Sequence, residues 1–134
     1  MKNRRSVLRA ITAGFAVSLA PLPATLRADE TGVMKEGSLE GQGDHEAAGT
    51  VAILESGGSN YVSFGVDFVF DGAPDPRVAL GRDGIDHETL LGKLSSNSGT
   101  QNYEIPEDLD PNNYDEVWIW CEQNEMPLAR AKMS

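Results

Sequence analysis

The chemistry that this sequence can support depends first on a single thiol. Cys121 is the only cysteine among the 134 residues, which excludes an intrachain disulfide and any four-cysteine zinc or iron–sulfur site. It ends a short apolar run, and the alternation of a β-strand would place it on one face with Val117 and Ile119. Trp118 and Trp120 would share the opposite face. Because a cysteine beside Val and Ile is usually an inert core residue, the run alone favours a buried thiol.

Two histidines are the other candidates for ligands or proton carriers. His45 opens the sequence HEAAG, but its fifth position is Gly49 rather than the second His of a zinc-protease motif. His87 lies in a polar stretch. One Cys and two His are too few for a tetrahedral zinc site built from protein ligands alone. No CxxCH, GxSxG, P-loop or GxGxxG motif is present. We therefore expect solvated loop histidines, no metal site and no catalytic residues of a hydrolase.

An acidic loop near the C-terminal end offers oxygen atoms at alternating positions, as a calcium site requires. The residues are Asp108, Asp110, Asn112 and Asp115. However, Asn113 stands where an EF-hand has glycine, and no glutamate occupies the twelfth position. We expect a solvated acidic turn rather than a cation site.

Charge is distributed unevenly along the chain. Its 11 basic and 21 acidic residues give a net charge of -10, which argues against nucleic-acid binding, because phosphate neutralisation needs a face of Lys and Arg. Five of the basic residues and no acidic residue fall within residues 1–28. There, a basic start, an apolar stretch interrupted by two prolines and a small-residue exit predict a cleaved signal peptide rather than a membrane span.

Within this leader, residues 3–9 read NRRSVLR, which is similar to a twin-arginine export signal. The alternative is an ordinary secretory leader, and either one predicts an exported protein in the periplasm or outside the cell. Cleavage after Ala28 removes five of the eleven basic residues and no acidic one. The mature chain of 106 residues would then carry six basic and 21 acidic side chains, a net charge of −15.

The apolar segments of the mature chain are short, and Gly, Pro and Asn turn signals separate them. Residues 29–42 are acidic and Gly-rich and predict a flexible N-terminal segment. Asp86 is expected to cap one short helical turn. In residues 61–70, five apolar residues alternate with polar or small ones: Val62, Phe64, Val66, Phe68 and Phe70. Further strands are expected at 50–54, 77–80, 101–105, 114–121 and 128–133. The pattern predicts an all-β fold, a compact antiparallel β-sandwich or barrel of about seven short strands.

Residues 43–134 resemble the DM-thirteen domain, an extracytoplasmic domain often associated with DOMON domains. The matching pieces occur in the order of the family and are individually short: His45 with Gly49–Val51, Phe64, Phe68, Gly72–Asp75 with Val78 and Leu80, Leu91–Leu94, Gly99–Tyr103 with Ile105 and Pro106, Asp110, Tyr114, Val117–Cys121 and Ala131. The resemblance implies a β-sandwich-like fold and a signature cysteine, here Cys121. It also implies a role in electron transfer, with this cysteine as a redox-active thiol or as the ligand of a prosthetic group such as haem.

Under that resemblance, the surroundings of Cys121 favour a ligand or a structural thiol over a nucleophile. A reactive thiolate needs nearby cations or a helix N-terminus, whereas Glu122 and Glu125 follow Cys121 in an acidic mature chain. His45 is the first candidate for a second ligand to a bound haem. An acidic surface would also steer a redox partner protein that has a basic surface.

The alternative is a non-redox extracytoplasmic binding module. Trp118 and Trp120 would suit stacking on sugars if their face is exposed to solvent, although packing between strands is the more usual role of paired tryptophans. In both hypotheses the chain is an accessory domain rather than a stand-alone catalyst.

Overall fold

The computed structural model describes residues 31–134. The predicted leader at 1–28 lies outside the described residues. Strands dominate, joined by turns and two short 3-10 segments, η2 (His87–Thr89) and η3 (Pro111–Asn113). The strands are β2 (Thr31–Gly41), β3 (Ala47–Ala48), β4 (Thr50–Ser56), β5 (Ser59–Phe64), β6 (Val69–Phe70), β7 (Pro76–Gly81), β8 (Gly92–Lys93), β9 (Gln101–Ile105), β10 (Glu116–Cys121) and β11 (Met126–Lys132).

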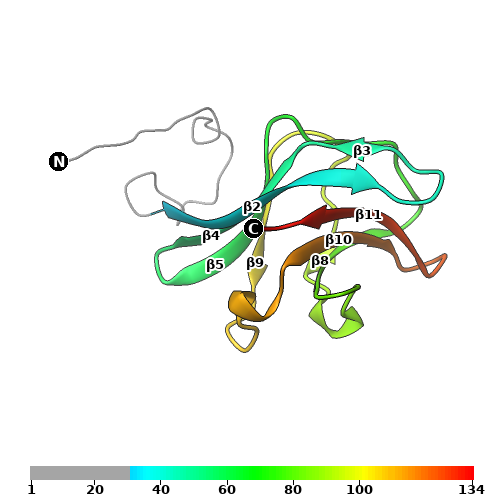
Figure 1. The fold of residues 1–134 in the computed structure, drawn as a ribbon. Helices are drawn as coiled ribbons and strands as arrows, with labels where there is room; N and C mark the ends of the chain where they lie inside the picture. Colours follow the sequence, from blue (N-terminus) through cyan, green and yellow to red (C-terminus); the bar gives the residue numbers. More distant parts are fainter. Residues whose placement is uncertain (1–30) are drawn as a thin grey trace.

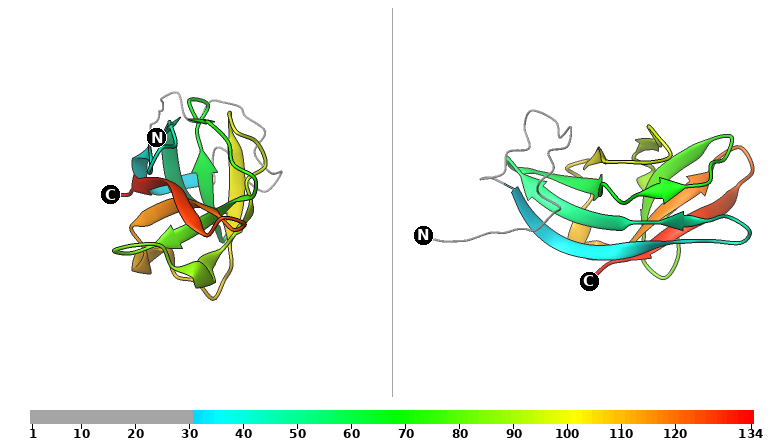
Figure 2. Two further views of the ribbon diagram at one scale, coloured as in Figure 1. Left: turned by 90° about the vertical axis from the view of Figure 1, so that its right-hand side faces the viewer. Right: turned by 90° about the horizontal axis from the view of Figure 1, so that it is seen from above.

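Eight of these strands form one antiparallel sheet in the order β8-β7-β10-β11-β2-β4-β5-β9, and β3 pairs with β6. The sheet curls until it is nearly closed (Figures 1 and 2). Side chains of β9 close the remaining gap, because the N–H of Ser95, just after β8, donates to Tyr103 Oη at 2.8 Å and to Gln101 Oε1 at 3.1 Å. The predicted antiparallel β-sandwich or barrel of short strands is confirmed.

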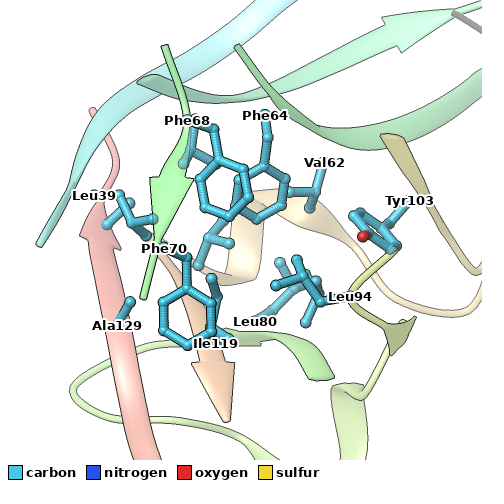
Figure 3. Close-up of a cluster of buried hydrophobic side chains, with 14 of the residues drawn as sticks. Leu39, Val62, Phe64, Phe68, Phe70, Leu80, Leu94, Tyr103, Ile119 and Ala129 are labelled. Carbon is cyan, nitrogen blue, oxygen red and sulfur yellow. The ribbon is translucent and has the colours of Figure 1, made fainter. Parts of the chain in front are cut away.

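The interior is filled by the inward-facing side chains of both halves of the sheet. Phe64 packs on Phe68 with ring centroids 4.7 Å apart and meets the edge of Tyr103 at 5.9 Å. Figure 3 shows several of these side chains converging on the interior. One cluster of buried apolar residues therefore extends through the barrel and includes Cys121. Within residues 31–134, no helix is long and apolar enough to span a membrane.

The strand predicted at 61–70 is interrupted in the middle. β5 ends at Phe64, and Val66, predicted to face the core, is 65% exposed. The chain turns here because Asp67 accepts hydrogen bonds from the N–H and Oγ1 of Thr50, both at 2.9 Å. A carboxylate held in this way competes with the backbone ladder. Phe68 regains the core after the turn, so the strict alternation was the wrong inference for this segment.

The prediction of a flexible segment at 29–42 is wrong for most of its length. β2 spans Thr31–Gly41, pairing with β4 from Thr31 to Ser38 and with β11 through Leu39, Glu40 and Gly41. It is the longest strand of the described chain, yet only Leu39 within it is buried. The sequence of β2 is polar and does not look like a strand, because β2 holds the two halves of the sheet together mainly through backbone hydrogen bonds.

Candidate functional site

Strand β10 presents the cysteine and the two tryptophans on opposite faces, as the alternation predicted. Val117, Ile119 and Cys121 are fully buried in the core cluster. Trp118 and Trp120 lie on the other face, outside that cluster. A β-bulge opposite β11 falls between Ile119 and Trp120. The strand therefore separates a thiol inside the barrel from an indole outside it, at neighbouring positions.

Cys121 lies at the end of β10, opposite Pro76 of β7 and Met126 of β11. The turn 122–125 then reverses the chain into β11 (Figure 1). The backbone N–H of Asn124, in this turn, donates a hydrogen bond to Cys121 Sγ at 3.4 Å. The turn is also tied to the start of β7, since the N–H of Glu122 donates to the carbonyl of Asp75 at 3.0 Å. The 122–125 turn therefore covers the thiol, which has no exposed surface.

This environment determines what the thiol can do. Full burial prevents a dissolved substrate from reaching Sγ. The N–H of Asn124 donates a hydrogen bond to this buried sulfur. A ligand role for Cys121 stays a prediction.

His45 is held by a carboxylate. Its Nδ1 lies 3.0 Å from Asp71 Oδ1, and Asp71 Oδ2 accepts the backbone N–H of Glu46 at 3.0 Å. The hydrogen bond from His45, followed by that of Glu46, lowers the pKa of the Asp71 carboxyl. A carboxylate beside Nδ1 favours the tautomer that carries its proton on Nδ1. The other ring nitrogen, Nε2, then keeps its lone pair and is the atom that can bind a metal. The sequence predicted a solvated loop histidine, but the structure holds His45 in one orientation through Asp71.

The fold brings His45 and Cys121 to the same end of the barrel without joining them. Ile119 pairs with Ala129, which pairs with Gly41, and the chain beyond Gly41 carries His45. Figures 1 and 2 show the loop after β2 and the turn after β10 at this common end. Because β11 lies between β10 and β2, the two strands are about 10 Å apart. The His45 ring contacts Asp71 and Phe70, and Cys121 Sγ accepts the N–H of Asn124.

The residues around Cys121 do not fit a haem in this conformation. Sγ has no exposed surface and is packed in the core cluster, which leaves no open side for an iron–porphyrin plane. Neither of the two hollows described below has Cys121 or His45 in its walls. Within residues 31–134, no three His, Cys, Asp or Glu side chains are gathered to hold a metal ion.

Trp118 is packed rather than exposed. Only 8% of it is accessible. Its Nε1 donates to Glu116 Oε1 at 3.0 Å, and the guanidinium of Arg130 lies 5.8 Å from the ring centroid. Glu116 is itself buried and also accepts the N–H of Gly84 at 2.9 Å. The packing role expected for paired tryptophans therefore holds for Trp118, and sugar stacking is left to Trp120 alone.

Trp120 lines a pocket of about 340 Å³. The edge of His87 meets the Trp120 ring with centroids 4.5 Å apart. The walls of this hollow, here called the Trp120 pocket, are His87, Leu90, Trp120, Glu122 and Glu125. A second hollow, of about 480 Å³, lies on the other side of His87 and has Arg82, Asp86 and Tyr114 in its walls.

His87, predicted from the sequence to be a solvated loop histidine, lines the Trp120 pocket instead. The available signal was Asp86, which caps η2 as predicted by accepting the N–H of Glu88 at 3.0 Å and so fixes where His87 points. The acidic loop likewise has structural partners: Asp110 caps η3 through the N–H of Asn112, and Asp115 pairs with Lys132 at 3.2 Å.

Comparison with known protein families supports the resemblance noted in the sequence. The model of the family described as "Electron transfer DM13" matches residues 39–133, from the end of β2 to just beyond β11. The match includes Cys121, His45 and all residues of the Trp120 pocket. No curated protein and no solved structure matches the chain. The chain belongs to the electron-transfer DM13 family.

Proposed function

We propose that this chain is an exported electron-transfer domain whose redox chemistry depends on Cys121. Membership of the DM13 family supports a redox-related role. The observation that carries the proposal is the position of Cys121 at the end of the barrel, beneath a single turn that donates the N–H of Asn124 to its sulfur.

A single cysteine restricts the form that this chemistry takes. One thiol cannot complete a two-electron thiol–disulfide cycle within the chain, because the second sulfur is missing. The proposal is therefore a one-electron role that depends on Cys121, and it assigns no haem to the conformation described here, in which Sγ is fully buried. His45, oriented by Asp71 at the same end, is the second residue whose replacement tests this role.

The test is a spectrum and a voltammogram of protein purified from its native export compartment. We expect a reversible midpoint potential that Cys121→Ala abolishes. Val117→Ala is the matched control, because Val117 is equally buried on the same face of β10 but offers no ligand atom. A potential that persists in Cys121→Ala, or no redox signal in the wild type, would refute the proposal. A visible Soret band that depends on Cys121 would identify haem as the group.

Export is part of the same proposal and rests on the leader at residues 1–28. Mass spectrometry of the mature protein should show an N-terminus at Asp29. Replacing Arg4 and Arg5 by lysine should block export if the leader is of the twin-arginine type, whereas an ordinary secretory leader tolerates that change.

A second function, non-redox binding of an extracytoplasmic polymer or protein, is favoured by the Trp120 pocket. Its aromatic wall is partly exposed and lies on the surface. Binding of an oligosaccharide that is lost in Trp120→Ala and unaffected by Cys121→Ala would support this function over the redox one.

A further inference from the structure

The Trp120 pocket combines an aromatic ring with carboxylates, a pairing that recognises cations. We propose that this pocket is the docking site for a Lys or Arg side chain on the basic surface of an electron-transfer partner protein. The inference rests on the electron-transfer function proposed above and adds the surface at which the partner binds.

The walls of the pocket are suited to a cation. Trp120 is only partly exposed, and the edge of His87 at 4.5 Å holds its ring in place. Glu122 and Glu125 are exposed and contribute acceptor oxygens to the same hollow. An ammonium or guanidinium group that enters can bind a carboxylate and lie against the indole, which is the most favourable ring for a cation–π contact.

Charges around the pocket define the side from which a partner approaches. Arg77 lies directly across from Trp120 on β7, and Lys93 pairs with Arg77 on β8. Arg77 is bound by Asp75 at 3.0 Å and also interacts electrostatically with Glu122, and Lys93 adds a second, exposed cation to this flank. The opposite flank, formed by Glu122 and Glu125, is negative. A basic partner is therefore expected to approach over the turn between β10 and β11.

This position links docking to the thiol. Trp120 and Cys121 are consecutive residues, with Cα atoms about 3.8 Å apart, and their side chains lie on opposite faces of β10. Glu122 and Glu125 belong both to the wall of the pocket and to the turn that covers Cys121. A partner that contacts these two carboxylates therefore contacts the turn whose Asn124 N–H is hydrogen-bonded to Sγ.

The experiment measures binding of a small basic c-type cytochrome, used as the probe, to the mature chain by calorimetry at low and at moderate salt. Glu122→Lys/Glu125→Lys reverses two charges at the pocket. The matched control Glu107→Lys/Asp108→Lys makes the same change in net charge in an exposed turn at the other end of β10. We expect a loss of roughly 10-fold or more in affinity for the pocket variant and roughly 2-fold for the control, with binding weakened by added salt.

Two further variants test the ring and the flank. Trp120→Ala should weaken binding by roughly 5-fold, whereas Trp120→Phe retains most of it because a ring is kept. Lys93→Glu should strengthen binding by removing a repulsive charge. The inference would be overturned if both charge-reversal variants lost the same affinity, or if the cytochrome did not bind at low salt. It would also be overturned if binding depended on Trp120 but not on Glu122 and Glu125, as expected for a sugar.

The redox proposal can fail separately. Cys121→Ala leaves the walls of the pocket intact, so it should bind the cytochrome like the wild type while failing to exchange electrons with it. Pocket-dependent binding without any Cys121-dependent potential would retain the docking site and refute the redox function. A Cys121-dependent potential with binding that ignores the pocket would do the reverse.

Discussion

Replacing Glu116 tests whether the outer face of β10 is held by a buried carboxylate. Glu116 is 2% exposed, and its Oε1 accepts both Trp118 Nε1–H at 3.0 Å and the N–H of Gly84 at 2.9 Å. Its Oε2 lies 3.6 Å from Arg130 and 3.9 Å from Lys132. Alanine would remove both acceptors and leave two N–H groups without partners, each at a cost of about 1–3 kcal/mol.

We therefore expect Glu116→Ala to lower the free energy of unfolding by about 3–5 kcal/mol. In Glu116→Gln, the amide oxygen can still accept from the same two N–H groups, and mainly the negative charge is lost. That loss is small, because Arg130 and Lys132 are partly exposed and such ion pairs contribute only about 0–1 kcal/mol. Charged hydrogen bonds become neutral ones, so Glu116→Gln should cost about 1–2 kcal/mol.

Urea unfolding followed by tryptophan fluorescence measures both variants. With a slope of about 1.5–2 kcal/mol per molar urea, Glu116→Ala should lower the midpoint by about 2 M. Glu107→Ala, an exposed carboxylate, is the control and should change stability by less than about 0.5 kcal/mol. The reasoning is refuted if Glu116→Ala costs less than 1 kcal/mol, or if the glutamine and alanine variants are equally unstable.

Three other predictions concern the backbone, pH and the thiol. Gly49→Ala should destabilise the fold by more than about 3 kcal/mol in urea unfolding, because a Cβ there would lie 2.5 Å from a backbone atom at a φ of 123°. Gly43→Ala, with φ 63° and open space, should cost only about 1–2 kcal/mol. The hydrogen bond from His45 lowers the pKa of Asp71, so the stability it contributes is present above the usual Asp value of about 3.9 and is lost as pH falls through the lowered value. The gap between wild type and Asp71→Asn in urea midpoints should therefore close on acidification, and a constant gap would contradict this. Cys121→Ala should remain folded and lose about 1–2 kcal/mol, as measured by urea unfolding, for the missing sulfur and its hydrogen bond.

Sequence patterns predicted this fold best where one face of a strand is buried. The segment 117–121 alternates strictly, and the structure places its cysteine inside and its tryptophans outside. The cap at Asp86 was also predictable, because its role depends on a local hydrogen bond. Patterns failed at β2, whose contribution to the sheet is made by backbone groups that any sequence possesses. They failed again at Val66, where Asp67 binds Thr50 from a distant strand and turns the chain.

The candidate site shows the same division. Cys121 was a candidate as the only thiol, and His45 was one through the family resemblance. The partner of His45, Asp71, lies 26 residues further along the chain, and no sequence pattern predicted their contact. His87 became a candidate only when η2 placed its ring against Trp120. Contacts between remote segments depend on the closure of the sheet, which residue spacing does not encode.

The structure shows which acidic side chains are paired with cations and which of them line the Trp120 pocket. Net charge alone predicts that any basic protein is attracted to every face of the domain. It also predicts that removing any one carboxylate weakens binding by the same amount. The structure pairs several carboxylates internally, Asp71 with His45, Asp115 with Lys132 and Glu116 with Arg130. Asp75 and, more weakly, Glu122 raise the pKa of Arg77. Glu122 and the exposed Glu125 flank a tryptophan whose chain neighbour is the only thiol. If electron transfer occurs at Cys121, the turn that bears these two carboxylates also donates a hydrogen bond to its sulfur, so docking and redox behaviour should respond together to changes in this turn.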